Sequence, residues 1–460
     1  MKIKDLKIDV EFFFSDQYWQ LFVEFTDNEI GLLEMGSENL PRKGFLLRLG
    51  IFGFGLCRSV ARHISGMVPK INVDVDRPET LILSGSDNEY KSTKFLEYDA
   101  DSNVLYCGTI KTKGSAPVQA YLFGALFLPL LVIRFFISTA EQRNLYKFLS
   151  DQFLLVMGWR IVQRDIYRRR NIRTVVYSNH MSPASRSAVA LAREYSDATV
   201  IYVEHTPILT YWPAVDADVY CLSGQFSLDN MMRRSVLNGK DVYLLGSPKN
   251  DAIKFRKKSS SNSHIGLCVS TVDDLEVVRN LIRNILSHDD STKLIVRPHP
   301  AFRDFEAQLA LGHPRLFIRK PIDESVQDYF CSIDRLLVND SGIFFEGLLA
   351  GVDVLRVKMS RDSLNNYGVP QEFSSIYNES ISEATAFIFS NDSVSLDRKK
   401  IQFFFGNIAT KFEDNASEIT SMVIDSYGEK ETGMAKRNKI KTYLSESKHD
   451  GCCIYRLITQ

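Results

Sequence analysis

The fold class follows from two segments, LIVRPHP at 294–300 and RLLVNDSGIFFEGLLAGVDVLRV at 335–357. In each, a short apolar run typical of a buried strand stops at polar residues, Arg297 and His299 in the first and Asn-Asp-Ser-Gly in the second. Apolar residues at helical spacing follow the second run, and Gly351 stands just past their end. Ligands bind beyond the carboxyl ends of parallel strands, and helix N-termini attract anions. These segments therefore predict a site for a phosphate-bearing ligand.

The composition is that of an ordinary globular protein. With 460 residues, 45% of them hydrophobic and 24% charged, the chain is long enough for two domains or a few. Lys plus Arg and Asp plus Glu both number 56, so no global field favours nucleic acid, and we expect no nucleic-acid partner. The seven cysteines are scattered without a CxxC pair, which fits a reducing compartment and argues against a zinc site. The N-terminus lacks a signal-peptide core, so we expect a cytoplasmic protein.

The N-terminal segments show several patterns. Alternating runs at 8–14 and 18–25 predict a β-hairpin or adjacent strands. The glycine-rich segment 44–64 predicts a tight strand–helix turn, with a dinucleotide site as the weaker alternative because the third glycine of GxGxxG is missing. Further short strands are predicted at 80–83 and 103–107.

Segment 114–133 carries no charge over 20 residues, which just suffices to cross a bilayer. A glutamine and two prolines interrupt it, and a second apolar helix is predicted at 149–162, so a buried or monotopic helix pair is favoured over a true span. The basic run 159–173 is either a solvated helix end or a contact with anionic lipid head groups. We expect membrane-associating helices near 114–170, and a protein peripheral on the inner face of the cytoplasmic membrane.

From residue 174 onward, strands alternate with helices on both sides of a basic, serine-rich linker at 255–264. The predicted strands are 174–178, 199–203, 242–245, 265–270, 294–296 and 335–338, and the first helix of each half is 184–195 and 272–286. This alternation predicts an α/β protein with two doubly wound parallel sheets facing each other. We expect an N-terminal domain over 1–254, a C-terminal domain over 265–428 and a loosely held basic tail at 429–460.

Polar residues recur where the predicted strands end. They are Asn179 and His180, Glu204 and His205, Lys249 to Asp251, Arg297 and His299, and Asp340 and Ser341. In two facing sheets such ends line one cleft. The groups suit transfer from a nucleotide leaving group: a base deprotonates the acceptor hydroxyl, while cations and helix N–H groups stabilise the departing phosphate without a metal. A lone histidine is more often structural, and His313 in an expected loop is interpreted in that way.

Four motifs stand in order between 174 and 360. They are His205-Thr206-Pro207, GSPKND at 246–251, RPHP at 297–300, and NDSG at 339–342 with Glu346. Their order and spacing resemble those of bacterial GT-B transferases that use cytidine-activated donors. These are CDP-glycerol glycerophosphotransferases, polysialyltransferases and capsule-type Kdo transferases. The resemblance implies a GT-B fold with an acceptor-side N-terminal and a nucleotide-donor-binding C-terminal Rossmann-like domain. It does not cover the first 170 residues.

The resemblance also implies roles by position. The acceptor-activating base is His205, with Glu204 and His180 as further catalytic residues. The donor-binding residues are Arg297, His299, Asp340, Ser341, Gly342, Glu346, Ser247 and Lys249, and the acceptor-side residues are Asn179, Ser182 and Arg186. Arg297 and His299 hold the donor phosphate, Ser341 and Gly342 cap it, and Glu346 binds ribose or cytosine. No metal and no cofactor are expected, since the nucleotide sugar is a substrate.

Three positions depart from the family patterns. Thr206 replaces a glycine, Gly342 replaces a second serine, and Glu346 stands where the glycerophosphate group carries Asp. The last departure favours a sugar donor. The acidic motif of polysialyltransferases is absent near 180–206, which disfavours that activity.

The sequence thus predicts a glycosyltransferase that moves a CMP-linked Kdo or sialic-acid-like sugar to a capsule or lipopolysaccharide glycan. A CDP-polyol phosphotransferase, a UDP-sugar 2-epimerase-like enzyme and a non-catalytic scaffold of a polysaccharide assembly complex remain as alternatives. The apolar segment speaks against the epimerase, which needs no acceptor.

Overall fold

The structure is a computed structural model of the chain. It describes residues 3–15, 18, 44–64, 79–98, 103–107, 118–180, 182–210, 216–233, 237–255, 264–300, 302, 304–360, 368–369, 377–378, 381–389, 397–406, 415–428, 437–438, 440, 444–449 and 452–457.

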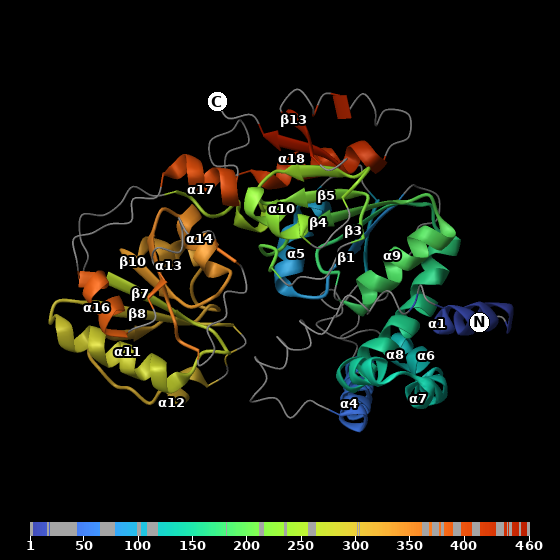
Figure 1. The fold of residues 1–460 in the computed structure, drawn as a ribbon, viewed down its shortest axis with the longest axis horizontal. Coiled ribbons are helices and arrows are strands. Elements are labelled where there is room, and N and C mark those ends of the chain that lie inside the picture. Colours follow the sequence, from blue (N-terminus) through green and yellow to red (C-terminus); the bar gives the residue numbers. More distant parts are fainter. Residues whose placement is uncertain are drawn as a thin grey trace.

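Two separate sheets form the centres of the two halves of the molecule (Figure 1). In the described residues the first sheet has the strand order β13-β14-β6-β5-β4-β3-β1-β2, and only the β13–β14 pair is antiparallel. Its strands are β1 (Glu79–Leu83), β2 (Asn103–Cys107), β3 (Ile172–Tyr177), β4 (Thr199–Val203), β5 (Val219–Leu222), β6 (Asp241–Leu244), β13 (Leu444–His449) and β14 (Cys452–Leu457).

The second sheet is parallel throughout its described strands, in the order β12-β11-β10-β7-β8-β9. Its strands are β7 (His264–Val269), β8 (Lys293–Pro298), β9 (Leu316–Ile318), β10 (Arg335–Val338), β11 (Asp353–Val357) and β12 (Tyr377–Asn378).

Helices cover both sheets and build a separate group beside the first (Figure 1). The helices before residue 255 are α1 (Ile3–Phe14), α4 (Phe45–Ile64), α5 (Asp87–Thr93), η1 (Lys94–Tyr98), α6 (Val118–Ala125), α7 (Leu128–Ile137), α8 (Ala140–Arg169), α9 (Pro183–Tyr195), α10 (Gln225–Met232) and η2 (Pro248–Asn250). Those after it are α11 (Leu275–His288), α12 (Phe305–Leu309), α13 (Val326–Cys331), α14 (Ile343–Leu349), α16 (Ile381–Phe389), α17 (Arg398–Phe405) and α18 (Ala416–Gly428).

The central strands of both sheets are buried on two faces, which is why they are continuous apolar runs rather than alternating ones. In β3, Val175 and Tyr177 belong to one hydrophobic core and Val176 belongs to the core on the other face. The strand period of two places successive side chains on opposite faces. The prediction of two Rossmann-like, doubly wound domains is confirmed, and the protein has a GT-B fold.

The predicted hairpin near the N-terminus is wrong for its first strand. Residues 8–14 lie in α1, and residues 19–25 of the second run lie outside the described residues. Asp5 and Asp9 are one helical turn apart and pair with arginines of α8 at the same spacing: Arg168 with Asp5 at 2.9 Å, and Arg164 with Asp9 at 2.6 Å. A contact more than 150 residues distant in sequence thus favours helix here.

The same ion pairs correct the interpretation of the basic run 159–173. Arg160 and Arg164 have exposed fractions of only 1% and 2%, and both pair with Asp9, whose exposed fraction is 0%. Arg160 also pairs with Glu194 of α9. These two side chains are therefore neither a solvated helix end nor available to lipid head groups.

The glycine-rich segment 44–64 is one helix, α4, so the predicted strand–helix turn is wrong, and the dinucleotide alternative loses the turn that it requires. Two of its glycines, Gly50 and Gly53, have open space around the position of a Cβ atom. A third, Gly55, lets α4 approach α6, since a Cβ atom there would lie 2.6 Å from the Tyr121 hydroxyl.

The prediction of a loosely held tail after residue 428 is also wrong. Strand β14 lies between β13 and β6 in the first sheet, with Ile454 opposite Val242. Helix α18, expected in the second domain, packs on β3 and β4 of the first sheet. The Asp251 carboxylate holds its start, accepting hydrogen bonds from the amides of Ala416 at 2.7 Å and Ser417 at 2.9 Å. The chain therefore crosses back to the first domain, and the predicted linker residues 256–263 lie outside the described residues.

Among the described helices, none is by itself long and apolar enough to cross a membrane. The pair α6 and α7, bent by 50° at a short break, passes the same test of length and composition when taken together.

Candidate functional site

His205 follows β4 at the carboxyl end of the first sheet. It is 8% exposed, and its Nδ1 lies in hydrogen-bond contact with the Ser178 carbonyl at the end of β3. A carbonyl only accepts, so Nδ1 carries the proton and Nε2 keeps its lone pair. Burial and the nearby Lys249 cation lower the pKa of His205 to about 4. The imidazole is therefore neutral near pH 7, in the tautomer that can accept a proton at Nε2.

Glu204 precedes His205 but faces another way. Its carboxylate accepts hydrogen bonds from the Ser223 amide at 2.7 Å, the Ser223 hydroxyl at 2.9 Å and the Ser227 hydroxyl at 2.7 Å. Burial raises the pKa of Glu204 to about 7 against those hydrogen bonds and the Lys249 charge. No hydrogen bond joins it to His205 in the described part of the chain. The carboxyl group therefore ties β4 to the end of β5 and the start of α10.

Lys249 connects the two domains. It lies in η2 after β6, and its Nζ is 2.9 Å from Glu346 Oε1 of α14 in the second domain. Both side chains are largely buried, at 10% and 16% exposed. Because the Lys249 charge also acts on Glu204 and His205, one cation is shared between the predicted base and the predicted donor-binding carboxylate.

Ser247, just before this lysine, is buried, and its hydroxyl has no hydrogen-bond partner among the described residues. A buried hydroxyl without a partner costs free energy, which a bound ligand can recover. Among the predicted donor-binding residues, Ser247 and Arg297, through its Nη1, therefore each carry a buried polar atom without a hydrogen bond in the described part of the chain.

The predicted acceptor-side residues lie around the end of β3. Asn179 donates to Glu89 Oε1 at 3.2 Å, and Arg186 Nε donates to the His180 carbonyl at 3.1 Å. Ser182 caps α9 by accepting from the Ser185 amide at 3.1 Å. Burial, with the charges of Arg186 and His205 nearby, lowers the pKa of His180 well below the ordinary value. His180 and His205 are thus close enough to interact electrostatically.

On the donor side, Arg297 contacts a carboxylate that sequence reasoning missed. Its guanidinium is buried, donates to the Glu324 carbonyl at 3.0 Å and lies 3.7 Å from the Glu324 carboxylate. His299 is exposed, and its amide donates to the Val269 carbonyl at 2.8 Å, joining the ends of β8 and β7. Neighbouring protein atoms exclude enough water to lower the pKa of His299.

The side chains of Arg356 and Asp273 hold the NDSG segment at 339–342 in place. Asp340 pairs with the buried Arg356 at 2.8 Å, and Asn339 donates to Asp273 at 2.7 Å. Ser341 and Gly342 begin α14 and accept from the amides of Phe344 and Phe345 through their carbonyls, at 3.0 and 3.1 Å. Asp340 therefore positions this turn.

The structure brings a subset of the predicted residues into one electrostatic group. Its members are His180, His205, Glu204, Lys249 and Glu346. Arg297 lies next to this group, since its charge and that of Glu346 both act on the pKa of the Cys268 thiol. Glu89 was missed: its second oxygen accepts from the Gly85 amide at 2.6 Å. Glu89 follows Ser86 in a local helix-capping pattern, but nothing local indicates its contact with Asn179, 90 positions away, or that of Glu324 with Arg297, 27 positions away.

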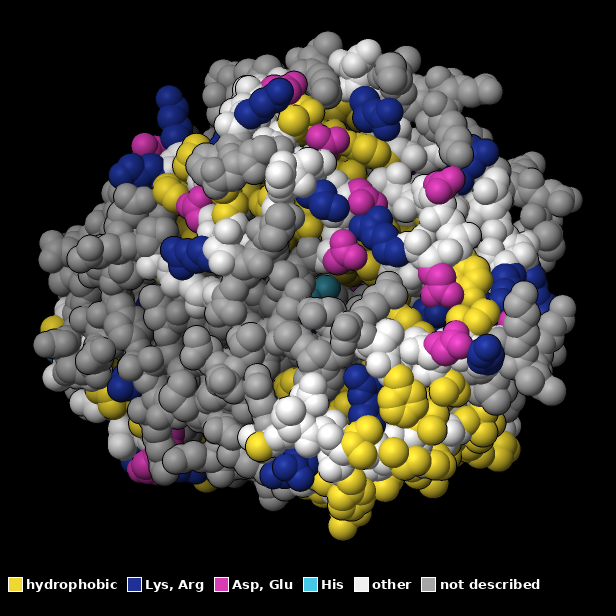
Figure 2. Space-filling view, turned by 45° about the vertical axis from the view of Figure 1, so that its right-hand side comes forward, with side chains coloured by type: hydrophobic (Ala, Val, Ile, Leu, Met, Phe, Trp, Pro, Cys, Tyr) yellow, Lys and Arg dark blue, Asp and Glu magenta, His cyan; other side chains and the backbone are white. Residues whose placement is uncertain are grey.

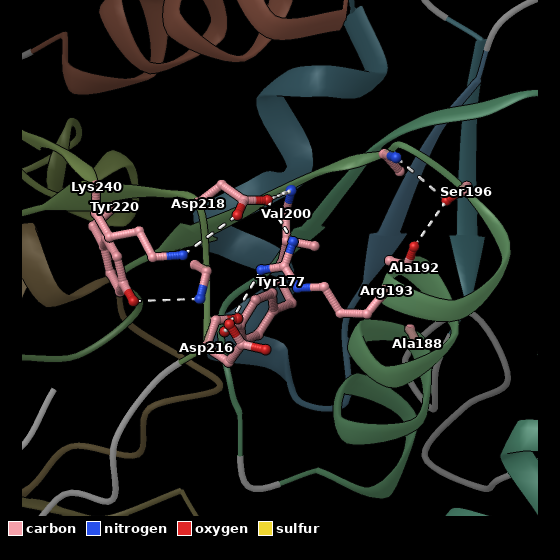
Figure 3. A network of polar contacts seen from close by, with 12 residues as sticks. Tyr177, Ala188, Ala192, Arg193, Ser196, Val200, Asp216, Asp218, Tyr220 and Lys240 are labelled. Atoms are coloured by element: carbon pink, nitrogen blue, oxygen red, sulfur yellow. Dashed lines mark hydrogen bonds and ion pairs between the residues drawn. The ribbon is translucent and has the colours of Figure 1, made fainter. Parts of the chain in front are cut away.

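The opposite, amino edge of the first sheet carries another charged cluster (Figure 3). Arg193 pairs with Asp218 at 2.8 Å and with Asp216 at 3.1 Å, and Lys240 lies 3.4 Å from Asp218. The Asp218 carboxylate also accepts from the Val200 amide at 2.9 Å. Burial raises the pKa of Asp218, but the hydrogen bonds from Arg193 and Val200 outweigh it and hold the pKa below its usual value.

Within the described residues, no group of three or more His, Cys, Asp or Glu side chains is arranged to hold a metal ion.

No known protein-family model matches the sequence, and no curated protein matches it. Among solved structures, one similar to this chain is described as a UDP-N-acetylglucosamine 2-epimerase from Listeria monocytogenes, with 14% identity and a TM-score of 0.48 over 77% of this chain and 97% of that one. Another is UDP-GlcNAc 2-epimerase from Neisseria meningitidis bound to UDP-GlcNAc, with 14% identity and a TM-score of 0.46 over 75% and 98%. A third is the glycosyltransferase SnogD from Streptomyces nogalater, with 10% identity and a TM-score of 0.39 over 75% and 100%. At these values the similarity concerns chain arrangement and says nothing about substrate.

Proposed function

We propose that the protein is a glycosyltransferase that moves a sugar from a nucleotide-activated donor to a glycan or glycolipid acceptor at the inner membrane surface. The donor we propose is a CMP-linked sugar acid of the Kdo or sialic-acid kind, and the acceptor a capsule or lipopolysaccharide glycan. The donor class rests on the resemblance of the sequence motifs. The observation that supports the reaction is the shared cation between His205 and Glu346.

His205 is the proposed base. Its lone pair at Nε2 is available near pH 7, and the Ser178 carbonyl fixes the ring in that tautomer. A neutral imidazole can take the proton of an acceptor hydroxyl as the oxygen attacks the anomeric carbon. The bond from that carbon to the nucleotide phosphate breaks, and the phosphate leaves with the electron pair.

Lys249 and Ser247 are the proposed partners of the leaving phosphate from the first domain. A cation and a hydroxyl fixed in a largely buried position stabilise developing negative charge better than mobile water does. When the phosphate binds Lys249, Glu346 loses its ion pair with that lysine. The Glu346 carboxylate can then accept hydrogen bonds from the hydroxyl groups of the donor. The proposed step needs no metal.

The test is a thermal-shift screen against CMP, CDP, UMP, UDP, GDP and dTDP. A ligand that binds only the folded state raises the melting temperature. Selective stabilisation by CMP supports the proposed donor class, a CDP preference indicates a polyol phosphotransferase, and a UDP preference indicates a UDP-sugar enzyme. If no nucleotide shifts the melting temperature, the proposal fails and a non-catalytic scaffold is favoured.

Two lysines at opposite ends of β6 make a matched pair for this screen. Lys249→Met should weaken nucleotide binding by roughly tenfold or more, since it removes a charge-assisted contact to phosphate. Lys240→Met, at the amino edge, should leave nucleotide binding unchanged. Equal effects of the two substitutions would contradict the placement of the donor.

A further inference from the structure

Most of the large apolar side chains exposed in the described residues gather on one small group of helices. On α4, α6, α7 and the α6–α7 turn they are Leu46, Leu47, Ile51, Phe54, Ile64, Leu122, Leu126, Ile133, Phe136 and Ile137. Figure 2 shows hydrophobic side chains covering the lower right of the molecule, where these helices lie. We call this surface the apolar helix face.

Helix α4 has two different sides. With 3.6 residues per turn, Leu46, Leu47, Ile51 and Phe54 point to one side, and Phe52 points to the other. The first group is 38% to 80% exposed, whereas Phe52 is only 6% exposed. One side of the helix therefore packs on the protein, and the other presents large apolar groups to the surroundings.

Helix α7 repeats this arrangement. Leu131 is buried, while Phe136 and Ile137 are 72% and 71% exposed. Ring contacts fix the helices against each other: Phe45 stacks on Phe135 with centroids 4.4 Å apart, and Phe52 meets Tyr121 at 5.3 Å. Because one side of each helix packs on the protein core and the other side exposes apolar groups, the helices can lie flat on a membrane surface.

The charges on these helices have one sign. Helix α4 contains three arginines, α7 contains one, and neither they nor α6 contains Asp or Glu. Arg48 pairs with Asp151 at 3.5 Å on the inner side, but Arg58 is exposed. Lys147 of α8 is exposed as well, and its carbonyl accepts from the Gly44 amide at the start of α4. The charged side chains that α4, α6 and α7 themselves carry are therefore all cationic.

We propose that the apolar helix face docks on an anionic lipid bilayer, with α4 and α7 lying in the plane of the interface. Exposed aromatic and aliphatic side chains enter the head-group boundary, and Arg58 and Lys147 contact lipid phosphates. Exposed apolar side chains on helices that carry arginines and no Asp or Glu match an anionic bilayer better than a protein surface of mixed charge. This proposal deepens the proposed function, on which its choice of a membrane-borne acceptor rests.

The docking surface is joined to the acceptor half of the site. Helix α8 packs against α4, α6 and α7 on one side and against α9 on another. The start of α9 carries Ser182 and Arg186, beside His180. A bilayer at the apolar helix face therefore lies on the acceptor domain, which suits an acceptor anchored in lipid.

The experiment is co-sedimentation of the full chain with vesicles of phosphatidylglycerol mixed with phosphatidylcholine, and with phosphatidylcholine alone. The protein should bind the anionic vesicles preferentially. Phe54→Glu and Phe136→Glu should each lower the apparent affinity about tenfold or more, because each removes a large exposed apolar group that would enter the bilayer and adds repulsion. Arg58→Glu should lower it by at least about fivefold.

The matched control is Ile322→Glu, which places the same charge at a 90% exposed apolar position of the second domain and should leave vesicle binding unchanged. Absence of binding to anionic vesicles, or equal binding by all variants, overturns the proposal. If Phe54→Glu instead converts a dimer to a monomer in sedimentation velocity, the face binds a second copy and the lipid proposal is likewise overturned. The nucleotide screen, performed without vesicles, reports separately on the proposed function.

Discussion

The two edges of the first sheet carry similar residue types in different electrostatic states. At the amino edge, Arg193 and Lys240 both pair with Asp218, and hydrogen bonds hold the Asp218 pKa below its usual value (Figure 3). At the carboxyl edge, burial raises the pKa of Glu204 and lowers that of His205, so both move toward their neutral forms.

The difference separates structure from chemistry. Charges that are mutually paired stabilise a fold, and their removal affects stability. Groups whose pKa values are shifted by burial, beside a shared cation and an unpartnered hydroxyl, mark a candidate functional site. Three predictions test this contrast.

The largest expected effect is on turnover in His205→Ala. Removing a general base lowers the rate by roughly a hundredfold to ten-thousandfold, while donor binding should persist. The measurement is steady-state transfer with the donor that the nucleotide screen identifies, together with the nucleotide thermal shift.

His313→Ala serves as the control, because this exposed histidine lies in a loop of the second domain. Wild-type turnover in His205→Ala would exclude it as the base. A loss of both turnover and nucleotide binding would instead indicate that the ring supports the cleft.

The second prediction concerns pH. The folded pKa of Glu204, about 7, lies above its unfolded value near 4.5, so the folded state binds more protons between these pH values and stability falls as pH rises through them. The folded pKa of His205, about 4, lies below 6.5, so its contribution rises from pH 4 to 6.5. Each pKa shift changes the free energy of unfolding by about 3 kcal/mol, and the two changes have opposite signs.

The two contributions are separated by measuring urea unfolding across pH for Glu204→Gln and for His205→Asn. The wild-type stability minus that of Glu204→Gln should fall between pH 4.5 and 7. The same difference for His205→Asn should rise between pH 4 and 6.5. If stability depended on pH in the same way for wild type and for either variant, burial would not shift the pKa of the substituted residue.

The smallest expected effect is a stability change at the amino edge. Asp218→Ala leaves Arg193, Lys240 and the Val200 amide without this acceptor and should cost about 1–3 kcal/mol, measured by urea unfolding. Nucleotide binding should not change, since the substitution is at the far edge of the sheet.

Ser247→Ala is the comparison at the carboxyl edge. Its hydroxyl has no partner among the described residues, so its removal should change stability by less than about 0.5 kcal/mol or be slightly favourable. A large stability loss in Ser247→Ala, or weaker nucleotide binding in Asp218→Ala, would remove the distinction between the two edges.

Sequence patterns predicted the second half of the fold well because the signals there are local. Apolar runs such as 335–338 match strands closely, and NDSG begins the helix that was expected after it. In the first half, strand β5 was missed because VYCL is only four residues long, although Ser223 and Gly224 follow it as a turn signal. The predicted site residues do follow strand ends, yet their catalytic and binding roles stay predictions.

The charged segments were harder to interpret from sequence. Asp9 and Arg164 are 155 positions apart, and neither segment contains a sign of the other. Without that partner, α1 resembled an alternating strand, and the arginines of α8 resembled a surface patch. Strands β13 and β14 were likewise not predicted, because the lysine-rich residues before them indicated a loosely held tail.

The sequence by itself determined the α/β alternation, the two-sheet fold class and the polar residues at the strand ends, because helical period, strand period and turn chemistry act over a few residues. The tertiary structure alone decided which charges are paired, which carboxyl and imidazole are neutralised, and which sheet the C-terminal strands join. Burial and ion pairing depend on groups that the chain brings together from distant positions, and those distances are set only when both domains have folded.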